Sequence, residues 1–181
     1  IAPVVAGSQL VIALQSIVSR NVDPLESAVI SVCEFNAGNA RNVIPQSVEL
    51  RGTVRTLRPN VRDLVEKRIR EITAGVAPPT GTKIDLTFAR GYPVTVNHAA
   101  QTDIATTIAK EIAGDSNVHE TPPMMGAEDF SYMLEARPGA FIFLGNGDSA
   151  GLHHPAYNFN DDAIPYGTSY WIKLVENTLA A

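Results

Sequence analysis

Two short motifs in the second half of the chain carry the residue types that metal and anion chemistry require. Residues 126–130 read GAEDF, a glycine turn expected to open a helix, and residues 151–155 read GLHHP, which places histidine in a short loop before another helix. Free backbone N–H groups at a helix start can hold an anion, and a neutral imidazole is a common metal ligand. A single histidine cannot form a metal site, so the other ligands must come from elsewhere.

The composition of the chain limits the classes of protein to consider. Its 181 residues are 45% hydrophobic, which suits one large domain or two small ones with a real core. A net charge of −5 argues against nucleic acid or an anionic membrane as partner. No apolar run approaches the roughly 18 residues of a membrane-spanning helix. Cys33 is the single cysteine, so we expect neither a disulfide framework nor a thiolate zinc cluster, and a reducing, cytoplasmic setting.

The first half of the chain shows the periodicities of a mixed α/β domain. Helical spacing of apolar residues covers 4–18 and resumes from Pro59. β-Branched residues mark a strand at 28–35, and two-residue alternation marks strands at 47–56 and 84–88. The order helix, strand, strand, helix, strand is that of a ferredoxin-like domain without its first strand. That strand would lie just upstream of Ile1.

The second half begins near Pro93, and the predicted domains are residues 1–92 and 93–181. Helices are expected at 102–113, 127–135 and 165–179, with Trp171 and Val175 facing inward. A short strand is expected at 117–120, and the continuous apolar run 140–144 is typical of a strand covered on both faces. These strands are too few for a separate sheet. The second half therefore looks like the C-terminal portion of a larger α/β domain.

Six motifs in a fixed order resemble one enzyme family: the metal-dependent amidohydrolases of the M20 peptidase clan, in the branch of hippurate hydrolases and auxin-conjugate hydrolases. The motifs are DPLESAV at 23–29, NVIP at 42–45, GTVR at 52–55, GAEDF at 126–130, LHHP at 152–155 and FNDD at 159–162. The resemblance covers essentially the whole chain. It implies a catalytic domain with two divalent ions, zinc or manganese, and a ferredoxin-like lid that forms a homodimer and closes over the substrate.

The function implied by this resemblance is hydrolysis of the amide bond of a small N-acyl amino acid, such as a hippurate-like compound, by a metal-activated water. The family's other metal ligands and its general-base Glu lie in an N-terminal half that this chain lacks. The chain alone is therefore expected to be inactive, and no catalytic residue is assigned within it.

The resemblance assigns His153 as a metal ligand, because the family pattern has histidine, one residue, then proline. His154 is the fallback, and the ordinary alternative is an exposed loop histidine. Arg55 resembles the lid arginine that grips a substrate carboxylate with its guanidinium fork. The alternative is that Arg55 is a solvent-exposed strand residue whose charge pairs with an acidic side chain across the sheet. Arg51 and Glu49 on the same face make such pairing plausible.

Three further residues are candidates for substrate binding. Asn42 resembles an asparagine that reaches an active site, often that of the partner subunit, although asparagine also favours turns. Gly126 and Ala127 are expected to open a helix whose N–H groups hold a carboxylate. Glu128 and Asp129 stabilise such a helix start in any protein.

Two other functions remain possible from the sequence. A ferredoxin-like binding or regulatory module without catalysis would explain the first half, but not the later motifs. A dipeptidase or deacylase from another branch of the clan would share every motif.

Overall fold

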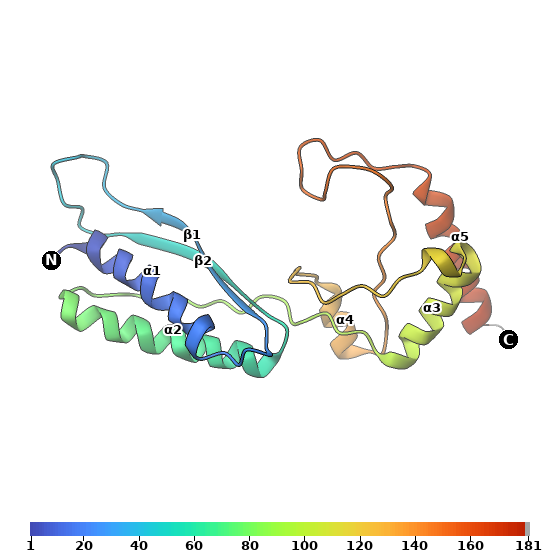
Figure 1. Ribbon diagram of the computed structural model, residues 1–181, viewed down its shortest axis with the longest axis horizontal. Coiled ribbons are helices and arrows are strands. Elements are labelled where there is room, and N and C mark those ends of the chain that lie inside the picture. The colour runs from blue at the N-terminus through green and yellow to red at the C-terminus, as the bar shows by residue number, and fades with distance from the viewer. Residues whose placement is uncertain (180–181) are drawn as a thin grey trace. The chain divides into compact units, whose positions relative to one another are not determined.

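A computed structural model describes residues 1–179 and divides the chain into two units. The first unit contains Ile1–Val94 and Pro123–Ala127, and the second contains Thr95–Pro122 and the described residues 128–179. The predicted domain boundary follows Tyr92, and the chain passes from the first unit to the second two residues later, after Val94. Both units are helical, and the first also has a sheet, so the predicted mixed α/β class is confirmed (Figure 1).

The first unit consists of a β-hairpin covered by two helices. The elements are α1 (Pro3–Arg20), β1 (Ala28–Asn36), β2 (Glu49–Thr56) and α2 (Pro59–Thr80), and β1 pairs antiparallel with β2. Proline starts both helices, where its missing N–H would have had no partner. Pro78 and Pro79 lie inside the last turn of α2, and Gly81, with a left-handed φ of 62°, ends the helix.

The core of the first unit lies between the helices and one face of the hairpin. Ile17 of α1 and Val65 of α2 are completely buried, and each such side chain contributes about 1.5–3 kcal/mol. The strand residues that pack against this core are Ile30, Val32, Leu50 and Val54. Because side chains alternate along a strand, Ser31, Thr53 and Arg55 lie on the opposite face.

The hairpin depends on a close approach of its two backbones at Gly52. Gly52 pairs with Val32, and the register shifts between Val32 and Glu34, so that Cys33 forms a bulge. A Cβ atom added to Gly52 would lie 2.3 Å from the carbonyl oxygen of Ser31. Only glycine fits this position without a shift of the strand.

The predicted strand at 84–88 is wrong, because residues 82–98 are extended but lack ladder hydrogen bonds. Phe88 nevertheless packs against the core. A strand needs a neighbour about 4.8 Å away. In a ferredoxin-like sheet the neighbour of this last strand is the first strand, which the described residues do not include.

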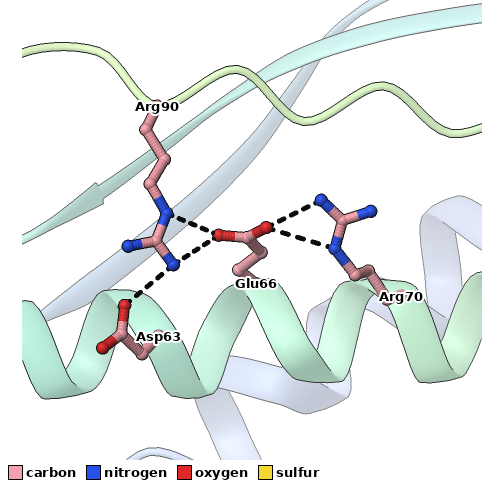
Figure 2. Close-up of polar contacts among 4 residues, drawn as sticks. All are labelled: Asp63, Glu66, Arg70 and Arg90. Carbon is pink, nitrogen blue, oxygen red and sulfur yellow. Dashed lines mark hydrogen bonds and ion pairs between the residues drawn. The ribbon is translucent and has the colours of Figure 1, made fainter.

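An ion cluster holds this extended segment on α2 (Figure 2). Arg90 contacts Glu66 at 2.7 Å and Asp63 at 2.8 Å, and Arg70 contacts Glu66 from the other side at 2.7 Å. The hydrogen bonds from Arg70 and then Arg90 lower the pKa of the Glu66 carboxyl below its usual value. The segment is therefore fixed to the helix at Arg90 although it is not part of the sheet.

The second unit is built on three helices, α3 (Ala99–Ala113), α4 (Phe130–Ala136) and α5 (Ala163–Thr178), with a short 3₁₀ helix at Asp115–Asn117. Its small core brings Ala105 and Ile108 of α3 against Tyr170 of α5. Burial raises the pKa of the Tyr170 hydroxyl.

The strands predicted at 117–120 and 140–144 are wrong, since neither segment is paired. Within the second unit, Phe143 is 61% exposed, and Trp171 and Val175, predicted to face inward, are 60% and 53% exposed. A covered strand requires neighbouring strands and a layer of side chains on each face. The described residues of this unit do not provide them.

Asn97 and His98 hold residues 139–141 through side-chain hydrogen bonds and through one backbone hydrogen bond, from the N–H of His98 to the carbonyl of Gly139 at 3.0 Å. The amide of Asn97 donates to the carbonyl of Phe141 and accepts from its N–H, both at 2.8 Å. His98, which follows Asn97, accepts a hydrogen bond at its Nδ1 from the N–H of Gly139 at 3.2 Å. His98 is half-buried here and has a structural role.

No helix within residues 1–179 is long and apolar enough to cross a membrane.

Candidate metal and carboxylate-binding residues

The loop before α5 carries the histidine pair, and its backbone is strained at His153. Residues 145–162 have no helix or strand (Figure 1). His153 has a φ of 66°, and among the described residues it is the one non-glycine residue with a positive φ. Such a left-handed conformation costs a residue with a Cβ about 1–2 kcal/mol. Strain of this size often accompanies function, because it presents a side chain in a fixed direction.

The two histidines of the pair have different environments. Nδ1 of His154 accepts a hydrogen bond from the N–H of Ala156 at 3.1 Å, and its carbonyl accepts from Tyr157 at 2.9 Å. His154 thus holds the turn together. The imidazole of His153 is exposed and forms no hydrogen bond or ion pair with the described residues. Both of its ring nitrogens are therefore available, and a neutral imidazole suits zinc or manganese.

The described part of the chain does not form a metal site by itself. Within residues 1–179, no three His, Cys, Asp or Glu side chains are grouped so that they could hold an ion. Four ligands around zinc, or six around manganese, need more donors than His153 provides. The donor type fits the metals, while the number of donors does not complete a site.

Arg55 and Arg51 lie on the same face of β2 but have different partners. Arg51 pairs with Glu49 at 2.9 Å and Glu34 at 3.9 Å, and its bond to Glu49 raises the pKa of its guanidinium. The cross-strand alternative considered for Arg55 therefore applies to Arg51. Arg55 has no carboxylate partner among the described residues, and its Nη1 donates to the backbone carbonyl of Met125 at 2.9 Å. This half-buried guanidinium keeps its charge unpaired by any described acid.

The helix expected to begin at Ala127 begins at Phe130 instead. Its first N–H, from Phe130, donates to Oε1 of Glu128 at 3.1 Å, and the next, from Ser131, donates to the Glu128 carbonyl at 3.3 Å. Glu128, which precedes α4, thus accepts hydrogen bonds from the first two N–H groups of the helix. Gly126 and Ala127 precede the helix, so any anion contact there would use their own N–H groups rather than a helix end.

Asn42 lies in the exposed loop that joins β1 to β2, and its side chain forms no hydrogen bond with the described residues. That loop joins β1 and β2 at one end of the hairpin (Figure 1). Arg55, which pairs with Val29, lies at the other end. At about 3.3 Å per residue, Arg55 lies roughly 20 Å along β2 from Glu49, where the loop rejoins the strand. Asn42 therefore belongs to the loop at the far end of the hairpin from Arg55.

Sequence reasoning missed two participants in these arrangements. The carbonyl of Met125 is a backbone group, for which side-chain patterns give no signal. Asn146 belongs to a segment that its composition marks only as a small-residue loop, yet its amide makes three hydrogen bonds within that loop. The Asn-Gly pair at 146–147 indicates a turn but not its distant partners.

Comparison with known proteins places all of these residues in one matched region. The family model described as peptidase family M20/M25/M40 matches residues 4–177. The hippurate hydrolase of Campylobacter jejuni is 40% identical over 173 residues, covering 95% of this chain and 45% of that protein. The N-acetyl-L-cysteine deacetylase of Bacillus subtilis is 38% identical, covering 90% of this chain and 38% of that protein. The chain therefore spans less than half the length of these relatives.

Among solved structures, the Bacillus subtilis YXEP protein superposes with a TM-score of 0.79 and 29% identity. The match covers 99% of this chain and 46% of that one. That protein is described as a dinuclear metal binding peptidase from the M20 family.

Proposed function

The chain belongs to peptidase family M20/M25/M40, and on that premise we propose that it is part of a metal-dependent amidohydrolase that cleaves the amide bond of N-acyl amino acids. The observation that carries the proposal is the different use of the two histidines. His154 is engaged in its own turn, whereas His153 presents a free imidazole from a strained backbone.

The residues of this chain would bind and orient the substrate rather than perform the chemistry. Arg55, which has no described carboxylate partner, would hold the substrate carboxylate through its planar fork. The backbone of Gly126 and Ala127, next to the Met125 carbonyl that Arg55 contacts, would line the same pocket. His153 would hold one of two zinc or manganese ions, which when bound supply a Lewis acid and an activated water.

The two predicted domains would have different roles in the complete enzyme. We assign residues 1–92 to the lid and residues 93–181 to the C-terminal part of the catalytic domain. The exposed apolar side chains of Phe143, Trp171 and Val175 support this assignment, because the rest of a larger domain would cover them. The remaining metal ligands and the general base would come from the region of the relatives that this chain does not span.

A homodimer formed through the lid would resolve the position of Asn42. Since Asn42 lies at the far end of the hairpin from Arg55, it would act in the active site of the partner subunit. An amide there can donate to a developing oxyanion. We also propose a cytoplasmic location, because the exposed thiol of Cys33 suits a reducing compartment.

A deacylase from the same family is the second candidate, because one close relative is named for the removal of an acetyl group from N-acetyl-L-cysteine. Arg55 and His153 would have the same roles in it, and the acyl group would differ. A module that binds without catalysis is disfavoured by a family match that covers both units.

The first experiment is the intact mass of the purified protein, followed by its metal content and a substrate panel. A mass well above 19.4 kDa with bound zinc or manganese and hydrolysis of N-benzoyl amino acids is the expected result. Faster hydrolysis of N-acetyl amino acids would favour the deacylase. A full-length protein that binds no divalent metal and cleaves none of these amides would refute the proposal.

A further inference from the structure

We infer that Asn146 is a positioning residue that preorganises the metal-binding loop around His153; this inference rests on the proposed function. Asn146 lies at the start of the loop and Asn160 at its end, with His153 midway between them. Asn146 is half-buried, and its side chain reaches across the neck of the loop to the opposite end.

Every hydrogen-bonding function of the Asn146 amide contacts this loop. Its Oδ1 accepts from the N–H of Asn160 at 2.8 Å, and its Nδ2 donates to the carbonyl of Asn158 at 2.8 Å and to Oγ of Ser149 at 3.0 Å. The partners fix the orientation of the amide, because a backbone N–H requires an oxygen and a carbonyl requires a nitrogen. Neither an aspartate nor a leucine of similar size could make both contacts.

The far end of the loop is in turn fixed to a rigid element. Oδ1 of Asn160 accepts from the N–H of Asp162 at 3.0 Å, and its carbonyl accepts from Ala163, the first residue of α5, at 3.0 Å. Asn146 therefore connects the beginning of the loop to the start of α5 through Asn160. Between these fixed ends, His153 keeps a left-handed backbone that an unrestrained chain would avoid.

The function of such a clamp is to reduce the entropy lost when a metal is bound. A metal ligand on a long irregular loop loses conformational entropy when the metal binds. A preorganised loop has already lost that entropy on folding, so binding is more favourable. Groups that orient a metal ligand typically change metal affinity about 10- to 100-fold when they are removed. Asn146 acts on the backbone that carries the ligand rather than on the ring itself.

The test uses the full-length protein and measures metal affinity by competition with a chromogenic chelator, with activity measured at limiting and saturating metal. We expect Asn146→Ala to weaken binding of the His153-dependent ion about 10- to 100-fold. We also expect kcat to recover largely at saturating metal, with the KM for substrate unchanged. Asn158→Ala is the matched control, because Asn158 contributes its backbone carbonyl and its side chain makes no described contact; it should bind metal as the wild type does.

A double-mutant cycle separates this inference from a general loss of structure. If Asn146 acts through His153, then Asn146→Ala should have no further effect on metal affinity in a His153→Ala background. Equal effects of Asn146→Ala in both backgrounds, or unchanged affinity in the single variant, would overturn the inference while leaving the metal site intact. If His153→Ala itself leaves metal binding unchanged, the proposed ligand is wrong, and the positioning role fails with it.

Discussion

The guanidinium of Arg55 donates a hydrogen bond from Nη1 to the backbone carbonyl of Met125 at 2.9 Å, across 70 residues of sequence. This contact joins the GTVR strand to Met125, the residue just before Gly126 and Ala127, and both segments are expected to recognise the substrate carboxylate. A carbonyl satisfies one donor of the five on a guanidinium and neutralises none of its charge. Arg55 is therefore held in place while it remains able to bind an anion.

Replacing Arg55 with lysine should weaken recognition of the substrate carboxylate. Lysine keeps the charge but loses the planar fork, and a hydrogen bond to a charged group contributes about 1.5–3 kcal/mol. We expect Arg55→Lys to raise the KM for an N-acyl amino acid about 10- to 100-fold in the full-length enzyme. Hydrolysis of the matching amide without a carboxylate should change little, and a steady-state comparison of the two substrates measures the difference.

Arg51→Lys is the control for this experiment, because Arg51 lies on the same face and is paired with Glu49 and Glu34. Its KM for both substrates should equal that of the wild type. An equal loss in Arg55→Lys for the substrates with and without the carboxylate would contradict the assigned role.

Substitutions of His153 and His154 should have different effects on metal affinity. His153→Ala should lower metal affinity by more than the roughly 100-fold seen when supporting groups are removed, because it deletes the ligand itself. His154→Asn should retain metal, since the asparagine oxygen can accept the N–H of Ala156 in a local turn. Elemental analysis after dialysis of both full-length variants gives the answer, and the reverse pattern would move the ligand to His154.

Gly52→Ala should destabilise the first unit. The new Cβ would lie 2.3 Å from the Ser31 carbonyl, and overpacking of this kind costs about 1–3 kcal/mol. Gly75→Ala is a control of opposite sign, because Gly75 is inside α2 and a Cβ added there would meet no neighbouring atom within 4 Å. Alanine there should stabilise the helix by about 0.5–1 kcal/mol. Urea unfolding followed by circular dichroism measures both, and equal midpoints for the two variants would refute the close approach.

The ion cluster at Glu66 should make stability depend on pH. Its carboxyl has a pKa below the ordinary value of 4.5 in the folded state because Arg70 and Arg90 donate to it. A lowered folded-state pKa adds stability that is fully present above the unfolded-state value and is lost as the pH falls through the folded-state value. Wild type should therefore melt above Glu66→Gln at pH 7, and the difference should shrink as the pH falls below 4.5.

Asp85→Asn is the control for the pH series. Asp85 pairs with Lys83, but both side chains are more than 80% exposed, and such surface pairs contribute little. Its melting temperature should follow the wild type at every pH. A constant difference between wild type and Glu66→Gln from pH 3 to pH 7 would show that packing, rather than charge, makes Glu66 stabilising.

Local patterns predict the elements whose partners are close in sequence. The alternation at 47–56 predicts β2, found at Glu49–Thr56, and its partner β1 is the preceding strand. The segments 84–88 and 140–144 have equally good strand patterns, yet neither is paired. Whether an extended segment becomes a strand depends on a neighbour that its own residues do not encode.

The candidate site is predictable in residue type and less so in geometry. The two histidines before Pro155 are candidates for a metal ligand through the family resemblance, and the preference for His153 over His154 comes from the same family pattern. The hydrogen bond from Ala156 to His154 gives a physical reason that the sequence does not contain. The predicted start of α4 lies three residues early, because Glu128 closes the helix end with its own side chain.

The left-handed backbone at His153 has an evolutionary consequence. On folding grounds alone, this position favours glycine or asparagine, which adopt a positive φ at little cost. Replacing His153 with glycine or asparagine should therefore make the fold more stable by about 1–2 kcal/mol while it removes the imidazole. If active enzymes keep histidine at position 153, selection for its imidazole must outweigh the stability that glycine or asparagine would add.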